Sequence, residues 1–234
     1  MIPSVWLKLI KQRTEGYPIF RARDLEPEAT HARRLIASWR RRGDVVSVAH
    51  GYHLVAADGS AVMASIDLTA YLLATTRFGR ALPVLCTVSA ARVHGVLDLD
   101  PCVGTVTVPM PTRPIALAQA RGTVIFCTRA EQIVGTRNVT LEEGDLDVSG
   151  ARAIVTTTST IGGSMVQLTS REQTALDLIH DRRLIEHDYQ LDSCLLSLAP
   201  SCEQERLDGI AFDQRRRRAR ISYRSTVSYL LAWR

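Results

Sequence analysis

The chain has 234 residues, of which 46% are hydrophobic and 23% are charged, and its formal net charge is +5. This composition excludes a disordered or collagen-like chain and predicts a globular protein with one large or two modest domains. No stretch approaches the roughly 18 apolar residues of a membrane span and no secretory leader is recognisable, so a cytoplasmic protein is expected.

The charge is unevenly distributed along the chain. Residues 1–55 hold 10 Lys and Arg against 5 Asp and Glu, a net charge of +5. Residues 56–202 carry a net charge of −4, and residues 203–234 a net charge of +4. The two basic ends therefore indicate contact with a polyanion, whereas the acidic middle does not.

The cysteines and histidines give no metal-binding pattern. Five cysteines are odd in number and widely spaced, without a CxxC pair, so buried reduced thiols are expected and a disulfide framework is not. His180 and His187 are seven residues apart, but no third ligand stands at a suitable spacing. We therefore predict neither a metal site nor any other cofactor.

The first 57 residues contain the patterns of several short elements in a recognisable order. A helix is predicted at 4–12, an extended segment at 19–20 followed by a short helix ended by Pro27, a helix at 30–42, and a hairpin at 45–55. This order is the plan of a winged helix-turn-helix domain, which we predict for residues 1–57.

The predicted helix at 30–42 has one apolar and one cationic side. Leu35, Ile36 and Trp39 follow helical spacing on one side, with Thr30 as a candidate N-cap and Gly43 as a C-terminal cap. In a winged helix-turn-helix domain this helix lies in the DNA major groove and the hairpin reaches an adjacent backbone. The alternative is an ordinary solvated charged face. The predicted DNA-binding residues are Thr30, Arg33, Arg34, Ser38, Arg41 and Arg42 in the helix, and His50 and His53 in the hairpin.

The remainder of the chain, residues 61–234, is predicted to form a mixed α+β domain after a linker at 56–60. The fold class of the whole chain is therefore α+β. Helices are predicted at 61–78, 87–95 (capped by Thr87 or Ser89), 171–181 (capped by Thr169 or Ser170), 191–198 and 220–233, and strands at 83–86, 105–110, 122–128, 137–141, 151–157 and 164–168.

Candidate catalytic groups in this second part have simpler structural explanations. Glu172 and Asp177 are five residues apart and do not share a helix face. Ser89 and His94 lack a GxSxG elbow, and no P-loop occurs. The absence of lysine after position 11 excludes the usual restriction-type nuclease site. We therefore predict no catalytic residues and no enzymatic activity.

A second basic cluster lies near the end of the chain. It fits an arm that contacts DNA, an RNA contact or a surface that docks a partner protein, and equally a solvated turn between helices. Its members are Arg215, Arg216, Arg217, Arg218 and Arg220.

Six segments of the chain together resemble the sequence pattern of a known family. In the N-terminal part these are RARDL (21–25), ARRLIASWRRRGDVVSV (32–48) and HGYHLV (50–55). In the second part they are LCTVSAARVHGV (85–96), VTVPMP (106–111) and LTSREQTALDLI (168–179). With these segments the chain resembles the AbiEi-type antitoxins of type IV toxin–antitoxin systems and related winged-helix transcriptional regulators, although His50 stands where the family usually has an arginine near the wing tip.

The resemblance implies a DNA-binding antitoxin that represses its own operon. The partners it implies are double-stranded DNA of its own promoter and a nucleotidyltransferase-like toxin, which it counteracts directly or functionally. A monomer or dimer on paired half-sites is expected. The alternative is a winged-helix regulator whose C-terminal domain senses a ligand or dimerises and has no toxin partner. A DNA-cleaving enzyme is a third, less favoured hypothesis.

Overall fold

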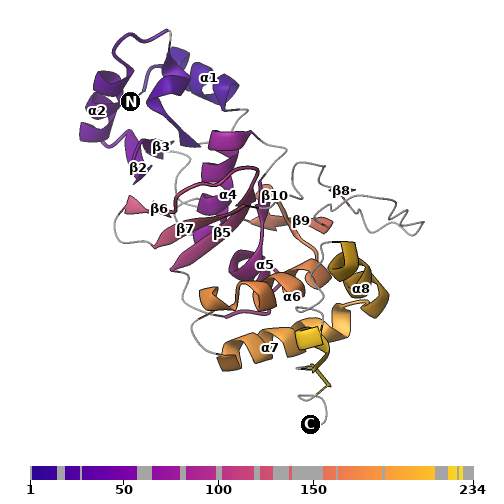
Figure 1. Ribbon diagram of the computed structural model, residues 1–234. Coiled ribbons are helices and arrows are strands. Elements are labelled where there is room, and N and C mark those ends of the chain that lie inside the picture. Colours follow the sequence, from indigo (N-terminus) through magenta and orange to yellow (C-terminus); the bar gives the residue numbers. More distant parts are fainter. Residues whose placement is uncertain are drawn as a thin grey trace.

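Two β-sheets and the helices packed against them form an α+β fold, as predicted (Figure 1). The basic cluster from Arg215 to Arg220, considered as a second contact surface, lies outside the residues that the structure describes. Of the helix predicted at 220–233, the structure describes residues 221–225 and 227–228, and these are helical. The computed structural model describes residues 2–14, 19–26, 28–56, 65–79, 83–98, 102–118, 122–128, 137–138, 155–161, 163–185, 188–213, 221–225 and 227–228.

The N-terminal elements follow the predicted order of helix, short helix, helix and hairpin. The hairpin strands join the extended segment in a three-stranded antiparallel sheet of order β1-β3-β2. The elements are α1 (Ser4–Arg13), β1 (Ile19–Phe20), the 3-10 turn η1 (Ala22–Leu25), α2 (Ala32–Arg41), β2 (Val45–Ala49) and β3 (Tyr52–Val55).

The apolar stripe of α2 anchors this helix to the other N-terminal elements. Ile36 and Trp39 are buried in one cluster with Ile10 of α1 and Leu25 of η1, while Leu35 is only half-buried. The indole rings of Trp6 and Trp39 lie with their centroids 6.3 Å apart. Because this stripe faces inward, the opposite side of α2 faces solvent.

The hairpin also packs against the second part of the chain. Val48 and Tyr52 belong to the same apolar cluster as the residues of α4 (Ile66–Phe78). The Thr76 hydroxyl donates to the carbonyl of Ile19 at 3.3 Å, and Ala49 forms an isolated bridge with Leu117. The N-terminal part therefore has an apolar cluster of its own, and its sheet also shares a second cluster with the part of the chain after the predicted boundary at 57–61.

The second sheet has seven strands in the order β6-β7-β5-β4-β10-β9-β8, with parallel and antiparallel pairs alternating across it. The five strands predicted between 105 and 168 and the strand at 83–86 are present with shifted ends, and β6 was not predicted. The strands are β4 (Val84–Leu85), β5 (Val103–Val108), β6 (Ile115–Ala116), β7 (Thr123–Thr128), β8 (Arg137–Asn138), β9 (Val155–Ile161) and β10 (Ser164–Thr169).

Four helices gather at the end of the molecule away from α1 and α2 (Figure 1). They are α5 (Thr87–Val93), α6 (Arg171–His180), α7 (Asp188–Leu198) and α8 (Gln204–Asp213), with 3-10 turns η5 (Arg182–Leu184) and η6 (Ala199–Ser201) between them. Helix α8 was not predicted. Among the described helices, none has the length and apolar character needed to cross a membrane.

The predicted caps of two of these helices had different outcomes. Ser170 caps α6, as predicted, by accepting a hydrogen bond from the Gln173 amide at 3.3 Å. The prediction for α5 was wrong, because Cys86 is its N-cap residue and makes no side-chain cap. The Ser89 hydroxyl accepts from the Thr105 amide of β5 at 2.8 Å and is therefore engaged with the sheet.

Gly104 allows α4 to lie close to strand β5. A Cβ atom at this position would come within 2.9 Å of the Ala70 Cβ and 3.1 Å of the Ile66 carbonyl oxygen. Such separations are too short for packed side chains, so the absence of a side chain at Gly104 sets the distance between helix and sheet.

Candidate nucleic-acid interface

The solvent side of α2 carries four exposed arginines. Arg33, Arg34, Arg40 and Arg41 are all exposed, and the small side chain of Ala37 lies between them on the helix surface. Arg40 was not among the predicted DNA-binding residues, although its position seven residues after Arg33 puts both on one helix face. The spacing alone would have identified it.

The guanidinium groups of these four arginines make no ion pair and no hydrogen bond with any residue that the structure describes. An arginine with five unused N–H donors can bind a phosphate or, in bidentate geometry, the major-groove edge of guanine. The face is therefore chemically suited to a nucleic-acid duplex.

Two other predicted contact residues are engaged with each other. The Arg42 Nε donates to Asp44 Oδ2 at 2.9 Å, and its Nη1 donates to the Ser38 hydroxyl oxygen at 3.1 Å. The Arg42–Asp44 pair is exposed, and exposed pairs are worth at most about 1 kcal/mol, so a phosphate can replace the carboxylate at small cost. The Ser38 hydroxyl keeps its own hydrogen for donation.

The C-terminal end of α2 is closed by a hydrogen-bonded glycine turn. Gly43 has φ +76°, as expected for the predicted cap. Its amide donates to the Arg40 carbonyl at 3.1 Å, and the Asp44 amide donates to the Trp39 carbonyl at 3.0 Å. This pair of bonds is a Schellman motif, and it fixes where the last arginines of α2 lie relative to the hairpin.

Gly43→Ala should reduce the free energy of unfolding by about 1 kcal/mol, because an L side chain is strained at this positive φ. Urea denaturation measures the change. Gly209→Ala in α8 is the matched control, since a Cβ there meets nothing within 4 Å and φ is not positive. Alanine should stabilise that helix by about 0.5 to 1 kcal/mol. Equal effects of the two substitutions would contradict the role of Gly43.

The predicted cap at the start of α2 was wrong. The helix begins at Ala32 with His31 at the N-cap position, and no side chain caps it. A preceding turn, in which the Ala29 amide donates to the Leu25 carbonyl and the Ala32 amide to the Ala29 carbonyl, leaves Thr30 one residue too early to cap. Thr30 is exposed and remains available at the same end of the helix.

The two predicted histidines of the hairpin differ in accessibility. His50 is exposed at the tip beside Gly51, which has φ +78°. His53 is half-buried with its ring centroid 5.8 Å from that of Phe20, and its Nδ1 is buried without a hydrogen-bond partner. Burial, followed by the nearby charges of Arg40 and His50, lowers the pKa of His53 to about 4. His53 is therefore neutral near pH 7 and offers no charge to a phosphate.

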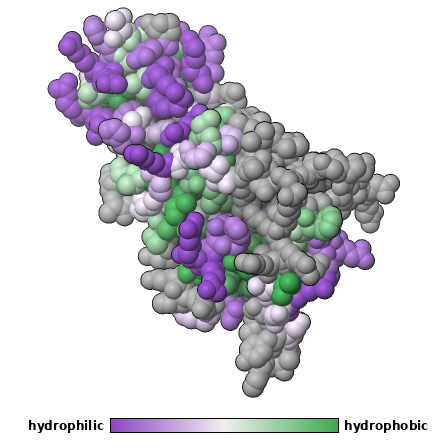
Figure 2. Space-filling model, in the orientation of Figure 1, coloured by the Kyte–Doolittle hydropathy of each residue, from purple (hydrophilic) through white to green (hydrophobic). Residues whose placement is uncertain are grey.

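Two arginines near α2 are paired within the chain. Arg13 pairs with Glu28 at 2.7 Å, and Arg21 pairs with Asp24 at 3.4 Å while its guanidinium lies 5.9 Å from the centroid of the Tyr52 ring. Lys8 and Lys11 of α1 are exposed, so positive charge lies on the surface of α1 as well as on α2. Figure 2 shows a mainly hydrophilic surface over this N-terminal part.

Comparison with known proteins identifies a shared fold. No known family model matches the chain, and no curated protein matches it in sequence. The chain is similar to the crystal structure of the RV2827C protein from Mycobacterium tuberculosis, with 13% sequence identity and a TM-score of 0.50. The match covers 97% of this chain and 82% of that one. At this identity the likeness extends to the fold alone.

The acidic residues of α6 that were considered as catalytic candidates are engaged in the packing of this helix. The buried Glu172 accepts from the Ser170 hydroxyl at 2.9 Å and from the Glu203 amide at 3.3 Å. The buried Asp177 accepts from the Gln173 side chain at 2.8 Å. Through these contacts both carboxylates stabilise the packing of α6.

Ser89 and His94 are also held apart from each other by their partners. The Ser89 hydroxyl donates to Asp67, whereas His94 Nε2 lies 2.9 Å from the Thr169 carbonyl. All five cysteines are free thiols, but the expectation that they are buried was right only for Cys86 and Cys194; Cys127 and Cys202 are half-buried and Cys102 is exposed. Across the described residues, no group of three or more His, Cys, Asp or Glu has the arrangement of a metal site; His187 of the His180–His187 pair lies outside them.

Proposed function

We propose that residues 1–57 act as a winged helix-turn-helix domain that binds double-stranded DNA. The observation that carries this proposal is the row of four exposed guanidiniums on α2 that have no internal partner among the described residues. In this arrangement α2 enters the major groove, and Arg33, Arg34, Arg40 and Arg41 contact guanine edges and phosphates. His50 at the hairpin tip then reaches the neighbouring backbone.

The packing of the hairpin joins the proposed DNA-binding domain to the second part of the chain. Val48 and Tyr52 belong to one apolar cluster with residues of α4, whereas α2 packs in the separate N-terminal cluster. Helix-turn-helix proteins generally bind paired half-sites one helical turn apart. Two copies of the chain on one operator, as a dimer or side by side, follow from this geometry.

The resemblance to AbiEi-type antitoxins extends the proposal to a biological role. In this role the chain represses its own operon and counteracts a cognate nucleotidyltransferase-type toxin, by direct binding or by opposing the toxin's effect. No catalytic step is assigned to the chain.

A second candidate function is a winged-helix regulator that senses a small molecule and has no toxin. The observation that favours it is a cavity of about 420 Å³ in the second part of the chain. The two candidate functions predict different growth of cells in which the chain is co-expressed with a toxin. An antitoxin restores growth of cells that express the nucleotidyltransferase-like protein encoded beside it, whereas a plain regulator does not.

A gel-shift titration of the chain's own promoter fragment tests DNA binding. About four to six phosphate contacts imply that affinity falls roughly 10²- to 10³-fold between about 50 and 200 mM salt. Unlabelled promoter fragment should compete better than an equal mass of unrelated duplex. If no shift occurs at low salt, or both duplexes compete equally, the proposal of sequence-specific DNA binding fails.

A further inference from the structure

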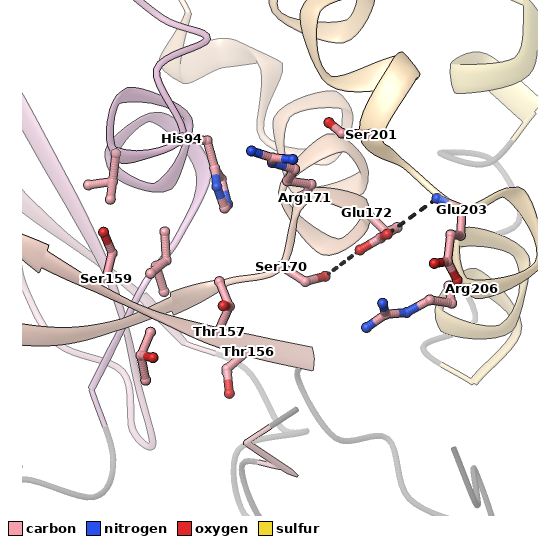
Figure 3. A pocket seen from close by; sticks show the side chains of 13 residues that line it. His94, Thr156, Thr157, Ser159, Ser170, Arg171, Glu172, Ser201, Glu203 and Arg206 are labelled. Atoms are coloured by element: carbon pink, nitrogen blue, oxygen red, sulfur yellow. Dashed lines mark hydrogen bonds between the residues drawn. The ribbon is translucent and has the colours of Figure 1, made fainter. Parts of the chain in front are cut away.

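A polar cavity lies between the end of β10, strand β9 and the helices that follow them. Its volume is about 420 Å³, within the range of 300 to 1,000 Å³ that is typical of small-molecule sites. Its walls come from four separate parts of the chain, which are the end of α5, strand β9, the end of β10 with the start of α6, and the segment from η6 to the first turn of α8 (Figure 3). None of the residues that line the cavity belongs to α2, so the cavity is a separate feature from the arginine face of that helix.

The inner wall of the cavity carries a carboxylate that is held in place. Glu172 is 4% exposed and Ser170 is 7% exposed, so both polar side chains are more than nine-tenths buried. Each carboxylate oxygen of Glu172 accepts one hydrogen bond, from the Ser170 hydroxyl and from the Glu203 amide (Figure 3). A carboxylate oxygen can accept two, so Glu172 retains capacity for an N–H donor of a ligand.

Two guanidinium groups flank this carboxylate without pairing with it. Arg171 lies on the side of His94, and Arg206 extends from α8 toward the space beside Glu172 (Figure 3). Neither guanidinium makes an ion pair or a hydrogen bond with any residue that the structure describes. Unused, forked N–H donors at the edge of a cavity suit a carboxylate or phosphate group.

The rest of the wall supplies neutral hydrogen-bonding groups. Thr157 and Ser159, on one face of β9, carry hydroxyls beside the cavity. Burial lowers the pKa of His94, so its neutral ring donates from Nε2 to the Thr169 carbonyl at 2.9 Å and keeps Nδ1 as an acceptor. Charged and neutral hydrogen-bonding groups, donors as well as acceptors, therefore line the same cavity.

We propose that this cavity binds a small molecule that carries both an oxyanion group, carboxylate or phosphate, and an N–H donor group. Arg206 binds the oxyanion, Glu172 accepts the N–H group, and the Thr157 and Ser159 hydroxyls bind the atoms between them. Free amino acids and nucleoside monophosphates both have this chemistry. The proposal does not depend on DNA binding by α2.

Thermal unfolding of the full chain with a panel of probes tests the proposal. The probes are the L-amino acids, as carboxylate sources, and the four nucleoside 5′-monophosphates, as phosphate sources. With a Kd of about 100 µM, a probe at about 10 mM raises Tm by roughly 5 to 10 °C. A shift with amino acids only, or with nucleotides only, supports the proposal and identifies the source of the oxyanion.

Substitutions locate the bound probe. Arg206→Gln should abolish most of the Tm shift, and Glu172→Gln should reduce it for probes with a cationic N–H group. Arg183→Gln, which removes an exposed arginine of η5 outside the cavity, should leave the shift unchanged. The proposal is overturned if no probe changes the Tm of the unsubstituted chain, or if the shift is as large in Arg206→Gln as in the unsubstituted chain.

Discussion

Replacing Arg34 and Arg41 together with alanine should weaken binding to the promoter fragment by roughly 30- to 1,000-fold, or about 2 to 4 kcal/mol. Each substitution removes an exposed guanidinium that has no internal partner among the described residues and is therefore available to the duplex. The dependence of affinity on salt should become shallower, by about one unit of slope for each phosphate that an arginine no longer neutralises. Fluorescence anisotropy at several salt concentrations measures both changes.

The matched control removes the same charge elsewhere. Arg182→Ala with Arg183→Ala lowers the net charge equally at two exposed positions in η5. Affinity for the promoter should change by less than about threefold, because these charges lie outside the proposed interface. Neither pair should alter the free energy of unfolding by more than about 0.5 kcal/mol, since all four side chains are on the surface. If the two pairs weaken binding equally, binding depends on net charge and not on α2.

Asp67→Ala should reduce the free energy of unfolding by about 3 to 5 kcal/mol, because it leaves the charge of Arg92 inside the fold without its partner. The carboxylate accepts two hydrogen bonds from Arg92, at 3.0 Å from Nε and 2.6 Å from Nη2, and one from the Ser89 hydroxyl. The Asp67 and Arg92 side chains are only 10% and 13% exposed. This network joins the first turn of α4 to α5, and urea denaturation measures the effect of removing it.

Two further variants test the role of the Asp67 network. Asp67→Leu combined with Arg92→Met should recover most of the stability that Asp67→Ala removes, since no charge is then left without a partner. Asp192→Ala, at a half-buried position of α7, should cost less than about 1 kcal/mol. The network does not have this role if the double variant is less stable than Asp67→Ala, or if Asp192→Ala is equally destabilising.

The parts of the fold that the sequence predicts well depend on local patterns. The burial of Ile36 and Trp39 follows from their helical spacing, and the positive φ of Gly43 follows from its place after the last helical residue. The hairpin follows from two β-prone runs around Gly51. In each case residues within one or two turns decide the structure, so no tertiary information is needed.

The parts that the sequence does not predict depend on contacts between distant residues. Tyr52 and Val48 belong to an apolar cluster that includes residues of α4, and nothing in the hairpin sequence indicates these distant partners. The half-buried state of His53 has the same origin, since it depends on Phe20 across the sheet. Thr30 is a residue type that commonly caps helices, but because of the turn at Ala29 the helix begins at Ala32 and not directly after Thr30.

The cavity of the second part could not be predicted for a related reason. Its walls come from segments as far apart in sequence as His94 and Arg206. Glu172 lies in the first turn of the helix that was predicted at 171–181, but the sequence could not indicate that Arg171 and Arg206 would flank it without pairing. No helix was predicted at the position of α8, so the sequence did not indicate that Arg206 would lie beside the cavity.

The central claim is that the solvent face of α2 contacts the DNA duplex, and site-specific photocross-linking measures this contact most directly. A photoreactive residue in place of the exposed Ala37, which lies between the four arginines, should cross-link to promoter DNA on irradiation. The same residue in place of the exposed Glu205 on α8 should not. A cross-link from position 205 with none from position 37, in protein that still shifts the promoter fragment, would contradict this claim.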